Sequence, residues 1–419
     1  MSTLPHTRIL REYTRVGFGP HGLAGSLRGC VGAIDRWISW AEAKQSHGPL
    51  LWFHGASVGE LRSLEPILHR IRSSASAPQF IFTHTSPSVE QWYPMFEVDR
   101  VDYMPVGPPA ALSSVFNAVK PGVLVFSRGD VWPHLVSKAT ERGIPLMVVG
   151  AEVRSDSKRL TWPLRSIFRR SYRSLDYVGA VTEEDALLYA RLGARTSAID
   201  VIGDPRHDQV LERTAVVRSD LFNGCQETTR RVVVAGSIEA DDEDPLLDCM
   251  ASYEPATRPL LIAAPHEPSR SNVSRLLQSA RDRGLTAESL TGNDPEGDHE
   301  CLVVDKLGLL GDLYAIADVA YVGGGFRKNK LHSVIEPAAF GVPVVLGPYW
   351  RNIADADPLV KAGGAVALGA EHPLIDLQSE LDQLLNDADY RWKRGLRARR
   401  CISRGAADAA AAAIMSRVA

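Results

Sequence analysis

The chain has 419 residues, of which 45% are hydrophobic and 23% are charged, and its formal net charge is −3. This length exceeds what one hydrophobic core usually serves, so a single small domain is excluded and two domains are expected. The nearly neutral balance gives no general attraction to nucleic acid, so any basic binding site must be local.

The N-terminal region, residues 1–49, contains one segment of mixed character. Residues 16–41 interleave aromatic and aliphatic side chains with Arg28 and Arg36. This pattern fits an amphipathic helix packed on its own domain, or a helix at a membrane surface. The chain lacks a signal-peptide pattern and any run of roughly 18 or more apolar residues, which predicts a cytoplasmic, non-spanning protein.

From residue 50 onward, short apolar runs alternate with helical patterns, as in a parallel sheet wrapped by helices. The apolar runs predict strands at 50–54, 80–83, 123–126, 146–149, 177–181 and 198–202, and then at 232–235, 260–263, 302–304, 319–322 and 344–346. A polar stretch interrupts this rhythm after residue 205. We therefore expect a first domain at 1–205, a linker at 206–231 and a second domain at 232–419 that closes with an alanine-rich helix at 406–415.

The predicted fold class is α/β, with two doubly wound Rossmann-like domains facing a central cleft. In such sheets, ligands bind outside the carboxyl ends of the strands. The sequence motifs at those strand ends are therefore the candidate site residues.

In the first domain, the strand at 50–54 ends in small residues and is followed by Glu60, in the first turn of a predicted helix. Spacing alone leaves two readings open for Glu60, because helix starts favour carboxylates and a cleft carboxylate can also act as a base. Another strand delivers Arg128 and Asp130 to the same rim. Taken alone, this pair would be a surface ion pair or a helix cap.

In the second domain, Gly236 and Ser237 form a turn after a strand, which is a possible phosphate site. The acidic run at 239–244 that follows reads as a solvated helix start rather than a metal site. His266 and Glu267 come just after the next strand, where His266 is placed either to contact a phosphate or to serve a structural role.

The most specific pattern is the glycine run at 323–325, followed by basic residues and a helix with a carboxylate. Glycines let a phosphate approach the backbone, lysines neutralise it, and a carboxylate can accept from ribose hydroxyls. The residues that we assign to a nucleotide site here are Gly324, Gly325, Lys330, His332, Ser333 and Glu336. The five cysteines have no zinc-like spacing, and neither metal ligands nor a cofactor is predicted.

These motifs resemble the GT-B glycosyltransferases, and among them the 3-deoxy-D-manno-octulosonic acid (Kdo) transferase family, over residues 50 to 350. The stretch His54–Glu60, with Ser57 and Gly59, matches the family's H-x-x-S-V-G-E motif, which supplies the general base. Ala235–Ser237 resembles its A-G-S turn, and His332 with Glu336–Ala338 resembles its G-G-H-N-x-x-E-P-A nucleotide site.

Three stretches depart from the family pattern. The family shows E-T-E-x-W-P-N where this chain has Arg128–His134, so a cation replaces the first carboxylate. Gly150–Ser155 resembles the family's G-A-R-x-S-x-R-S only loosely, and Pro265–Arg270 is a reduced form of P-R-H-P-E-R. Recognition of the acceptor is therefore expected to differ more than recognition of the donor.

The resemblance implies an inverting, metal-independent transfer of Kdo from CMP-Kdo to a lipid A precursor, with Glu60 as the base. A phosphorylated glycolipid acceptor also gives a role to the basic run between Arg154 and Arg173, which includes Lys158. Such a cluster suits phosphate contact and peripheral docking at the cytoplasmic face of the inner membrane.

Three alternatives stay open at this point. One is a GT-B transferase with another nucleotide sugar or acceptor, and another is a UDP-sugar 2-epimerase of the same architecture. The last is a non-catalytic binding protein that keeps the fold.

Overall fold

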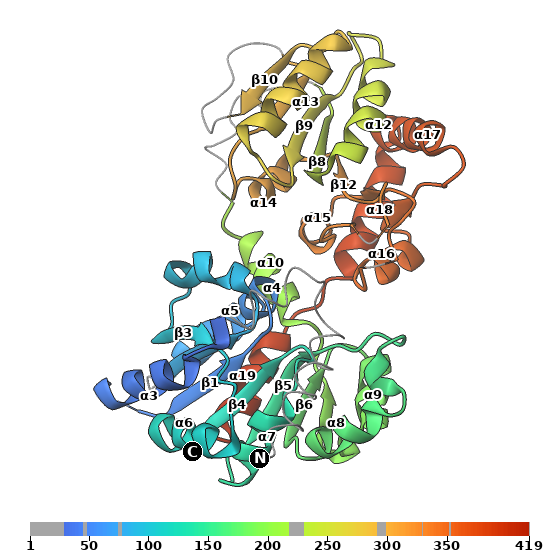
Figure 1. Cartoon of the computed structure of the whole chain (residues 1–419). Coiled ribbons are helices and arrows are strands. Elements are labelled where there is room, and N and C mark those ends of the chain that lie inside the picture. Colours follow the sequence, from blue (N-terminus) through green and yellow to red (C-terminus); the bar gives the residue numbers. More distant parts are fainter. Residues whose placement is uncertain are drawn as a thin grey trace. The chain divides into compact units, whose positions relative to one another are not determined.

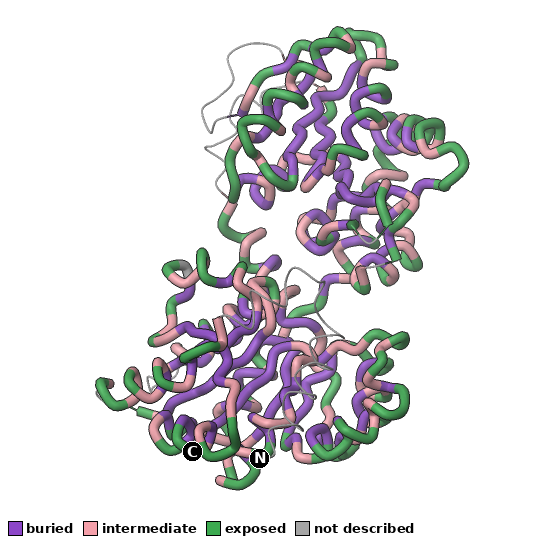
Figure 2. The backbone as a smooth tube through the Cα atoms, viewed as in Figure 1, coloured by how far each residue is buried: buried purple, intermediate pink, exposed green. Residues whose placement is uncertain are grey.

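The computed structural model describes residues 29–44, 48–73, 78–217, 230–290, 299–328, 330–351 and 353–418. The chain forms two compact units, unit 1 with residues 1–209 and 404–419, and unit 2 with residues 210–403 (Figure 1). Each unit is built around a parallel seven-stranded sheet whose strands are largely buried (Figure 2). The predicted α/β class with two doubly wound domains is confirmed.

The sheet of unit 1 has the strand order β3-β2-β1-β4-β5-β6-β7. Its strands are β1 (Leu50–His54), β2 (Gln79–His84), β3 (Arg100–Tyr103), β4 (Val123–Ser127), β5 (Leu146–Ala151), β6 (Tyr177–Ala180) and β7 (Ile199–Val201). The helices that pack on one face are α3 (Ala33–Ala43), α6 (Pro109–Val119), α7 (Pro133–Thr140), α8 (Leu164–Arg173) and α9 (Glu183–Leu192). On the other face lie α4 (Val58–Arg62), α5 (Glu65–Arg72) and α19 (Ala406–Met415). Short 3₁₀ helices complete the unit at η1 (Pro87–Met95), η2 (Lys158–Leu160) and η3 (Thr196–Ala198).

The sheet of unit 2 has the strand order β10-β11-β9-β8-β12-β13-β14. Its strands are β8 (Val232–Ile238), β9 (Leu260–Pro265), β10 (Ala287–Leu290), β11 (Cys301–Val304), β12 (Val319–Val322), β13 (Val344–Leu346) and β14 (Ala365–Ala367). One face is covered by α12 (Ala240–Ala251), α13 (Arg270–Asp282) and α17 (Pro373–Asn386). The remaining helices are α14 (Leu310–Leu313), η5 (Tyr314–Ile316), α15 (Ile335–Ala339), α16 (Ala356–Ala362) and α18 (Ala388–Arg400).

Three strands, β3, β10 and β14, are absent from the sequence prediction, and each lies at an edge of its sheet. Edge strands are short and carry polar residues, so they lack the apolar run that marks an interior strand. The sequence Arg100–Tyr103 shows this, since two of its four residues are charged.

The C-terminal helix α19 lies in unit 1, although we expected it to close the second domain (Figure 1). Its alanines Ala407, Ala410 and Ala411 are buried in the same cluster as the apolar side chains of α5, because small side chains let two helices approach closely. Buried Asp208, in α10 (Pro205–Arg213), accepts hydrogen bonds from the backbone N–H groups of Gly405 and Ala407, both at 2.7 Å. The predicted linker at 206–231 thus begins with a helix, and residues 218–229 lie outside the described part of the chain.

Helix α3 packs on its own unit, as the first of the two readings of residues 16–41 predicts. Trp37 is fully buried, and its indole N–H donates to the carbonyl oxygen of Tyr103 at 2.8 Å. Arg36 is held by Asp102 of the edge strand β3 at 2.7 Å. Residues 1–28 of the predicted membrane-surface segment lie outside the described residues. Within the described part of the chain, no helix is both long and apolar enough to cross a bilayer.

Candidate active site

Both groups of predicted site residues lie where their sheets change winding direction. In unit 1, the neighbouring strands β1 and β4 end at His54 and Ser127, and the chain continues from them toward opposite sides of the sheet. In unit 2, β8 and β12 are also neighbouring strands, and the chain continues from their ends toward opposite sides of the sheet. Open α/β sheets bind ligands outside the carboxyl ends of such strands. Each unit therefore has its own candidate site at this point.

Glu60 is fixed in place by hydrogen bonds to both its carboxylate and its backbone. The N–H of Ala56 donates to the Glu60 carboxylate at 2.7 Å, and the hydroxyl of Ser57 accepts from the Glu60 N–H at 3.5 Å. The hydroxyls of Ser63 and Ser127 both donate to the carbonyl oxygen of Glu60, at 2.7 and 2.8 Å. A base needs such positioning, because proton transfer depends on distance and direction.

The electrostatic surroundings of Glu60 suit a general base. Burial, and then the nearby carboxylate of Asp130, raise the pKa of Glu60 to about 7, against the opposing effects of the Ala56 N–H and of Arg128 and Arg159. A base is most effective when its pKa lies near the working pH. Glu60 is therefore able to release and take up a proton near neutrality.

Asp130 is anchored by a histidine and a tryptophan. The buried ring of His54 lies between the Thr83 hydroxyl at 3.0 Å and the Asp130 carboxylate at 3.3 Å, and the Trp132 indole N–H donates to the same carboxylate at 2.8 Å. Burial acts to raise the pKa of Asp130, but the contacts with His54, Arg159 and Trp132 outweigh it and hold the pKa below its usual value. Asp130 thus stays charged and acts on Glu60.

Arg128 has a left-handed backbone, with φ at 59°, which is uncommon for a residue with a side chain. Its guanidinium forms an ion pair with Glu152, and it lies 3.7 Å from the buried carboxylate of Asp204. The Tyr189 hydroxyl donates to the Arg128 carbonyl at 2.5 Å. Residues held in such sparsely populated conformations are concentrated at functional sites.

The pairing of Arg128 with Glu152 accounts for two departures from the family motifs together. Arg128 stands where the E-T-E-x-W-P-N motif has a carboxylate, and Glu152 stands where the G-A-R motif has an arginine. The two side chains form an ion pair in this chain, and each carries the charge opposite to the one that the motif has at its position.

We expect the reversals Arg128→Glu and Glu152→Arg to lower the melting temperature singly, because each places like charges side by side. The double variant should recover part of the loss, with a coupling of roughly 0.5–3 kcal/mol as for residues in direct contact, because the carboxylate introduced at position 128 would still lie beside the buried carboxylate of Asp204. Thermal unfolding of the four proteins measures this coupling. Additive losses would show that the pair makes no net contribution.

The basic run between Arg154 and Arg173 divides into inward and outward residues. Arg159, which the sequence placed among the surface cations, turns inward, donates to the carbonyl of Gly129 and lies 3.9 Å from Asp130. Arg154 is exposed and paired with Asp156 at 2.9 Å, and Lys158 is exposed. Within the described residues, no recorded contact joins Arg154 or Lys158 to Glu60. The sequence of this run has no periodicity that would distinguish the inward-facing Arg159 from the exposed cations near it.

The glycine residues of the unit 2 site are required by close packing. A side chain on Gly323 would meet the Ser237 carbonyl at 2.4 Å, and one on Gly324 would meet the Lys330 carbonyl at 2.1 Å. Gly324 is also left-handed, with φ at 82°, as is Ser237 at 53°. The turn at 236–237 and the turn at 323–325 are joined by the Gly323 N–H, which donates to the Gly236 carbonyl at 2.9 Å. The sequence-predicted turns therefore form one backbone unit.

Asp242 organises these two turns, although the sequence reading placed it in a solvated acidic run. It is fully buried, and it accepts from the N–H groups of Glu239 at 2.8 Å and Gly324 at 2.7 Å and from the Tyr321 hydroxyl at 2.7 Å. Burial raises its pKa against these hydrogen bonds. Asp242 lies three residues after the N-cap residue Glu239, which is the spacing of a capping box. This spacing was the signal for its role that the sequence offered.

The remaining predicted residues of unit 2 fall into two sets. The rings of His266 and His332 stack with centroids 4.1 Å apart, and Glu336 in α15 is bound by Arg213 of α10 at 3.2 Å. Arg213 was not predicted, because it precedes the apolar rhythm of the second domain. The other set consists of Glu267, Lys330 and Ser333, which are exposed, as is His266.

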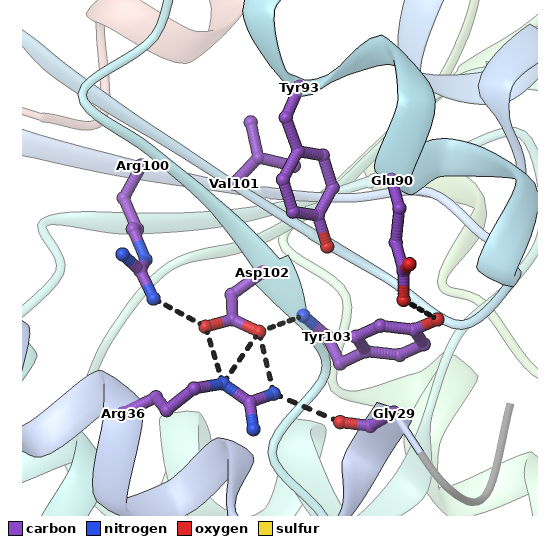
Figure 3. A pocket seen from close by; sticks show the side chains of 8 residues that line it. All are labelled: Gly29, Arg36, Glu90, Tyr93, Arg100, Val101, Asp102 and Tyr103. Carbon is purple, nitrogen blue, oxygen red and sulfur yellow. Dashed lines mark hydrogen bonds and ion pairs between the residues drawn. The ribbon is translucent and has the colours of Figure 1, made fainter.

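Unit 1 has a further pocket of about 550 Å³ beside the edge strand β3, which the sequence did not indicate (Figure 3). In it, Asp102 accepts from Arg36 and Arg100, and Glu90 accepts from the Tyr103 hydroxyl at 2.7 Å. Burial opposes the ionisation of Asp102, but the two arginines hold its pKa below the usual value. Because the charges of Arg36, Arg100 and Asp102 are paired within the cluster, we interpret it as a structural contact that holds α3 against β3.

Sequence comparisons match part of the chain to a family model and most of the chain to individual proteins. Residues 33–209 match the family model of 3-deoxy-D-manno-octulosonic-acid transferase (kdotransferase), and this match ends where the first segment of unit 1 ends. The chain is 26% identical to the 3-deoxy-D-manno-octulosonic acid transferase of Chlamydia trachomatis over 362 residues, which cover 84% of this chain and 83% of the relative. It is 27% identical to the Bordetella pertussis enzyme of the same name, over 88% of this chain and 91% of the relative.

Solved structures support the fold. UDP-GlcNAc 2-epimerase from Neisseria meningitidis aligns with a TM-score of 0.62 at 14% identity, over 88% of this chain and 100% of the epimerase. Acinetobacter baumannii MurG aligns with a TM-score of 0.58 at 12% identity, over 88% of this chain and 99% of MurG. At such identities these two likenesses bear on architecture alone. Taken with the sequence matches, they show that the chain has the GT-B fold and is similar over most of its length to named 3-deoxy-D-manno-octulosonic acid transferases.

Proposed function

We propose that the chain transfers Kdo from CMP-Kdo to a lipid A precursor in lipopolysaccharide biosynthesis, with inversion and without a required metal ion. The observation that carries this proposal is Glu60, which has a pKa raised to about 7 at the switch point of unit 1. It belongs to an intact family motif, in a chain whose relatives are named as transferases of this sugar.

In this proposal, Glu60 takes the proton from an acceptor hydroxyl, whose oxygen attacks the anomeric carbon of Kdo. The new bond forms on the face opposite to CMP, the bond from the anomeric carbon to the phosphate oxygen breaks, and CMP leaves with its electron pair. General base catalysis of this kind typically contributes about 10²–10⁴-fold in rate.

We assign the departing CMP to the unit 2 site. The left-handed turn at Ser237 and the glycines at 323–325 present backbone to an incoming phosphate, and His266 and Lys330 are cationic or proton-donating side chains in the segments beside them. Fixed donors and charges of this type stabilise negative charge as it develops. Glu336, oriented by Arg213 at 3.2 Å, is assigned to the ribose hydroxyls.

The test compares donors and acceptors in one assay with purified full-length protein. We expect CMP release from CMP-Kdo that depends on a lipid A precursor, survives a metal chelator and gives an inverted linkage by NMR. Turnover with a UDP- or GDP-sugar but not with CMP-Kdo would favour the transferase of different specificity. Absence of Glu60-dependent turnover with every donor would favour a non-catalytic binding protein.

We also propose that the protein binds peripherally to the cytoplasmic face of the inner membrane, through a surface of unit 1. Helix α8 and the residues before it expose cations together with Trp162 at 83% exposure and Ile167 at 45%. The exposed cations are Lys158, Arg169, Arg170 and Arg173. Interfacial aromatic side chains and cations suit anionic lipid. Equal co-sedimentation with neutral and anionic vesicles would contradict this assignment.

A further inference from the structure

The loop that follows β4, residues 128–130, is bound through its backbone by side chains from two other elements of unit 1. The Tyr189 hydroxyl of α9 donates to the carbonyl oxygen of Arg128 at 2.5 Å. The guanidinium of Arg159, in η2, donates to the next carbonyl oxygen, that of Gly129. Because main-chain oxygens accept these bonds, the two side chains fix the path of the loop itself.

The two side chains that bind this loop are anchored by aromatic residues of the core. Tyr189 is fully buried, and its ring packs edge-to-face on the buried ring of Tyr172, from α8, with centroids 5.7 Å apart. The Arg159 guanidinium donates to the Tyr172 hydroxyl at 3.4 Å and lies over the ring of Phe168, 5.9 Å from its centroid. Contacts of this kind favour particular geometries, so α8 and α9 help to hold both side chains in place.

The loop bears on the proposed chemistry because it carries Asp130. Burial, and then the charge of Asp130, raise the pKa of Glu60. The cations of Arg128 and Arg159 act in the opposite direction, since a nearby positive charge favours the ionised carboxylate. The Arg159 guanidinium also lies 3.9 Å from the Asp130 carboxylate. One arginine thus binds the loop, offsets part of the charge that the loop carries and limits the rise in the pKa of Glu60.

We propose that Arg159 is a positioning residue for the transfer reaction, which fixes the 128–130 loop and thereby the Asp130 carboxylate that acts on Glu60. It works through these groups, and we assign it no contact with donor or acceptor. The exposed cations of the same basic run are, by contrast, assigned to the lipid surface. This inference rests on the proposed function, because it requires Glu60 to be the base of the reaction.

The experiment measures kcat/KM of the full-length protein as a function of pH, with CMP-Kdo and a lipid A precursor. Arg159→Met removes the cation, so the limb that rises through about pH 7 should move to higher pH. The displaced loop should also lower the plateau, by up to about 10²-fold. Arg159→Lys keeps the charge and should restore the limb but not the full plateau, because an ammonium lacks the planar fork of donors. A purely structural arginine would lower activity without moving the limb.

Tyr189→Phe tests the positioning of the loop without any change of charge. It removes the hydroxyl that donates to the Arg128 carbonyl and keeps the buried ring. The plateau should therefore fall while the limb stays in place. Melting temperatures report whether each variant folds. An unchanged plateau in both Tyr189→Phe and Arg159→Lys would show that the grip on the loop is unimportant and would overturn the proposal.

Arg195→Met is the matched control. Arg195 also donates to a backbone carbonyl of unit 1, that of Leu175 at 3.1 Å, and lies 3.3 Å from Asp176, but it is not among the groups that act on Glu60. Its pH profile should match that of the unsubstituted protein. A limb that does not move in Arg159→Met would also overturn the proposal. Absence of Kdo transfer by the unsubstituted protein would contradict the proposed function, and this inference with it.

Discussion

Replacing Glu60 by Gln is expected to lower kcat by about 10²–10⁴-fold while leaving donor affinity nearly unchanged. Gln keeps the shape of Glu and can still accept from the Ala56 N–H, so the loss reports the missing base. Donor affinity should persist, because the assigned donor residues belong to unit 2. Steady-state kinetics together with calorimetric binding of the donor separate the two effects.

Glu65→Gln is the matched control. Glu65 also lies in the first turn of a helix of unit 1, and burial raises its pKa too, but its carboxylate accepts from Gln209. If helix-start carboxylates matter only for structure, both substitutions should act alike. A loss of kcat in Glu60→Gln but not in Glu65→Gln would identify Glu60 as the base, whereas full activity in Glu60→Gln would remove it from the mechanism.

The pH dependence should reflect the same carboxylate. With a pKa of about 7, Glu60 is the ionised base only at higher pH, so kcat/KM should rise as pH increases through 7 and then level off. Because the pKa is raised on folding, the folded chain holds this proton more tightly than the unfolded chain, and stability falls as pH rises from the unfolded value toward 7. Asp130→Asn removes a repelling charge and should shift the rising limb to lower pH.

Replacing Gly324 by Ala is expected to weaken donor binding at least tenfold. The added Cβ would lie 2.1 Å from the Lys330 carbonyl, and a backbone atom of this kind moves only if the turn itself moves. The displaced turn would also pull its N–H away from Asp242, which it now contacts at 2.7 Å. Calorimetric titration with CMP measures the loss.

Gly284→Ala separates this clash from the backbone cost. Gly284 has φ at 80°, close to the 82° of Gly324, but an added Cβ would have no neighbour within 4 Å. Both variants therefore carry the left-handed penalty of roughly 1–2 kcal/mol, and both should melt earlier. Equal effects of the two substitutions on CMP binding would show that the packing of the turn is unimportant.

The amino-acid sequence alone predicts the α/β class and the positions of the interior strands. Residues in these strands are buried on both faces, so Leu50–His54 and Val319–Val322 read as continuous apolar runs. It also located the strand-end motifs around Glu60 and Gly324, because glycines and carboxylates right after a strand are local features of the chain.

The tertiary structure alone decided which distant residues meet at those strand ends. The pairing of Arg128 with Glu152, the burial of Asp242 beneath the glycine turn and the placement of α19 in unit 1 all join segments that no local pattern relates. Parallel strands bring such segments to one edge only after the sheet has formed, because each crossover separates neighbouring strands by a helix. The stacking of His266 on His332 has the same origin.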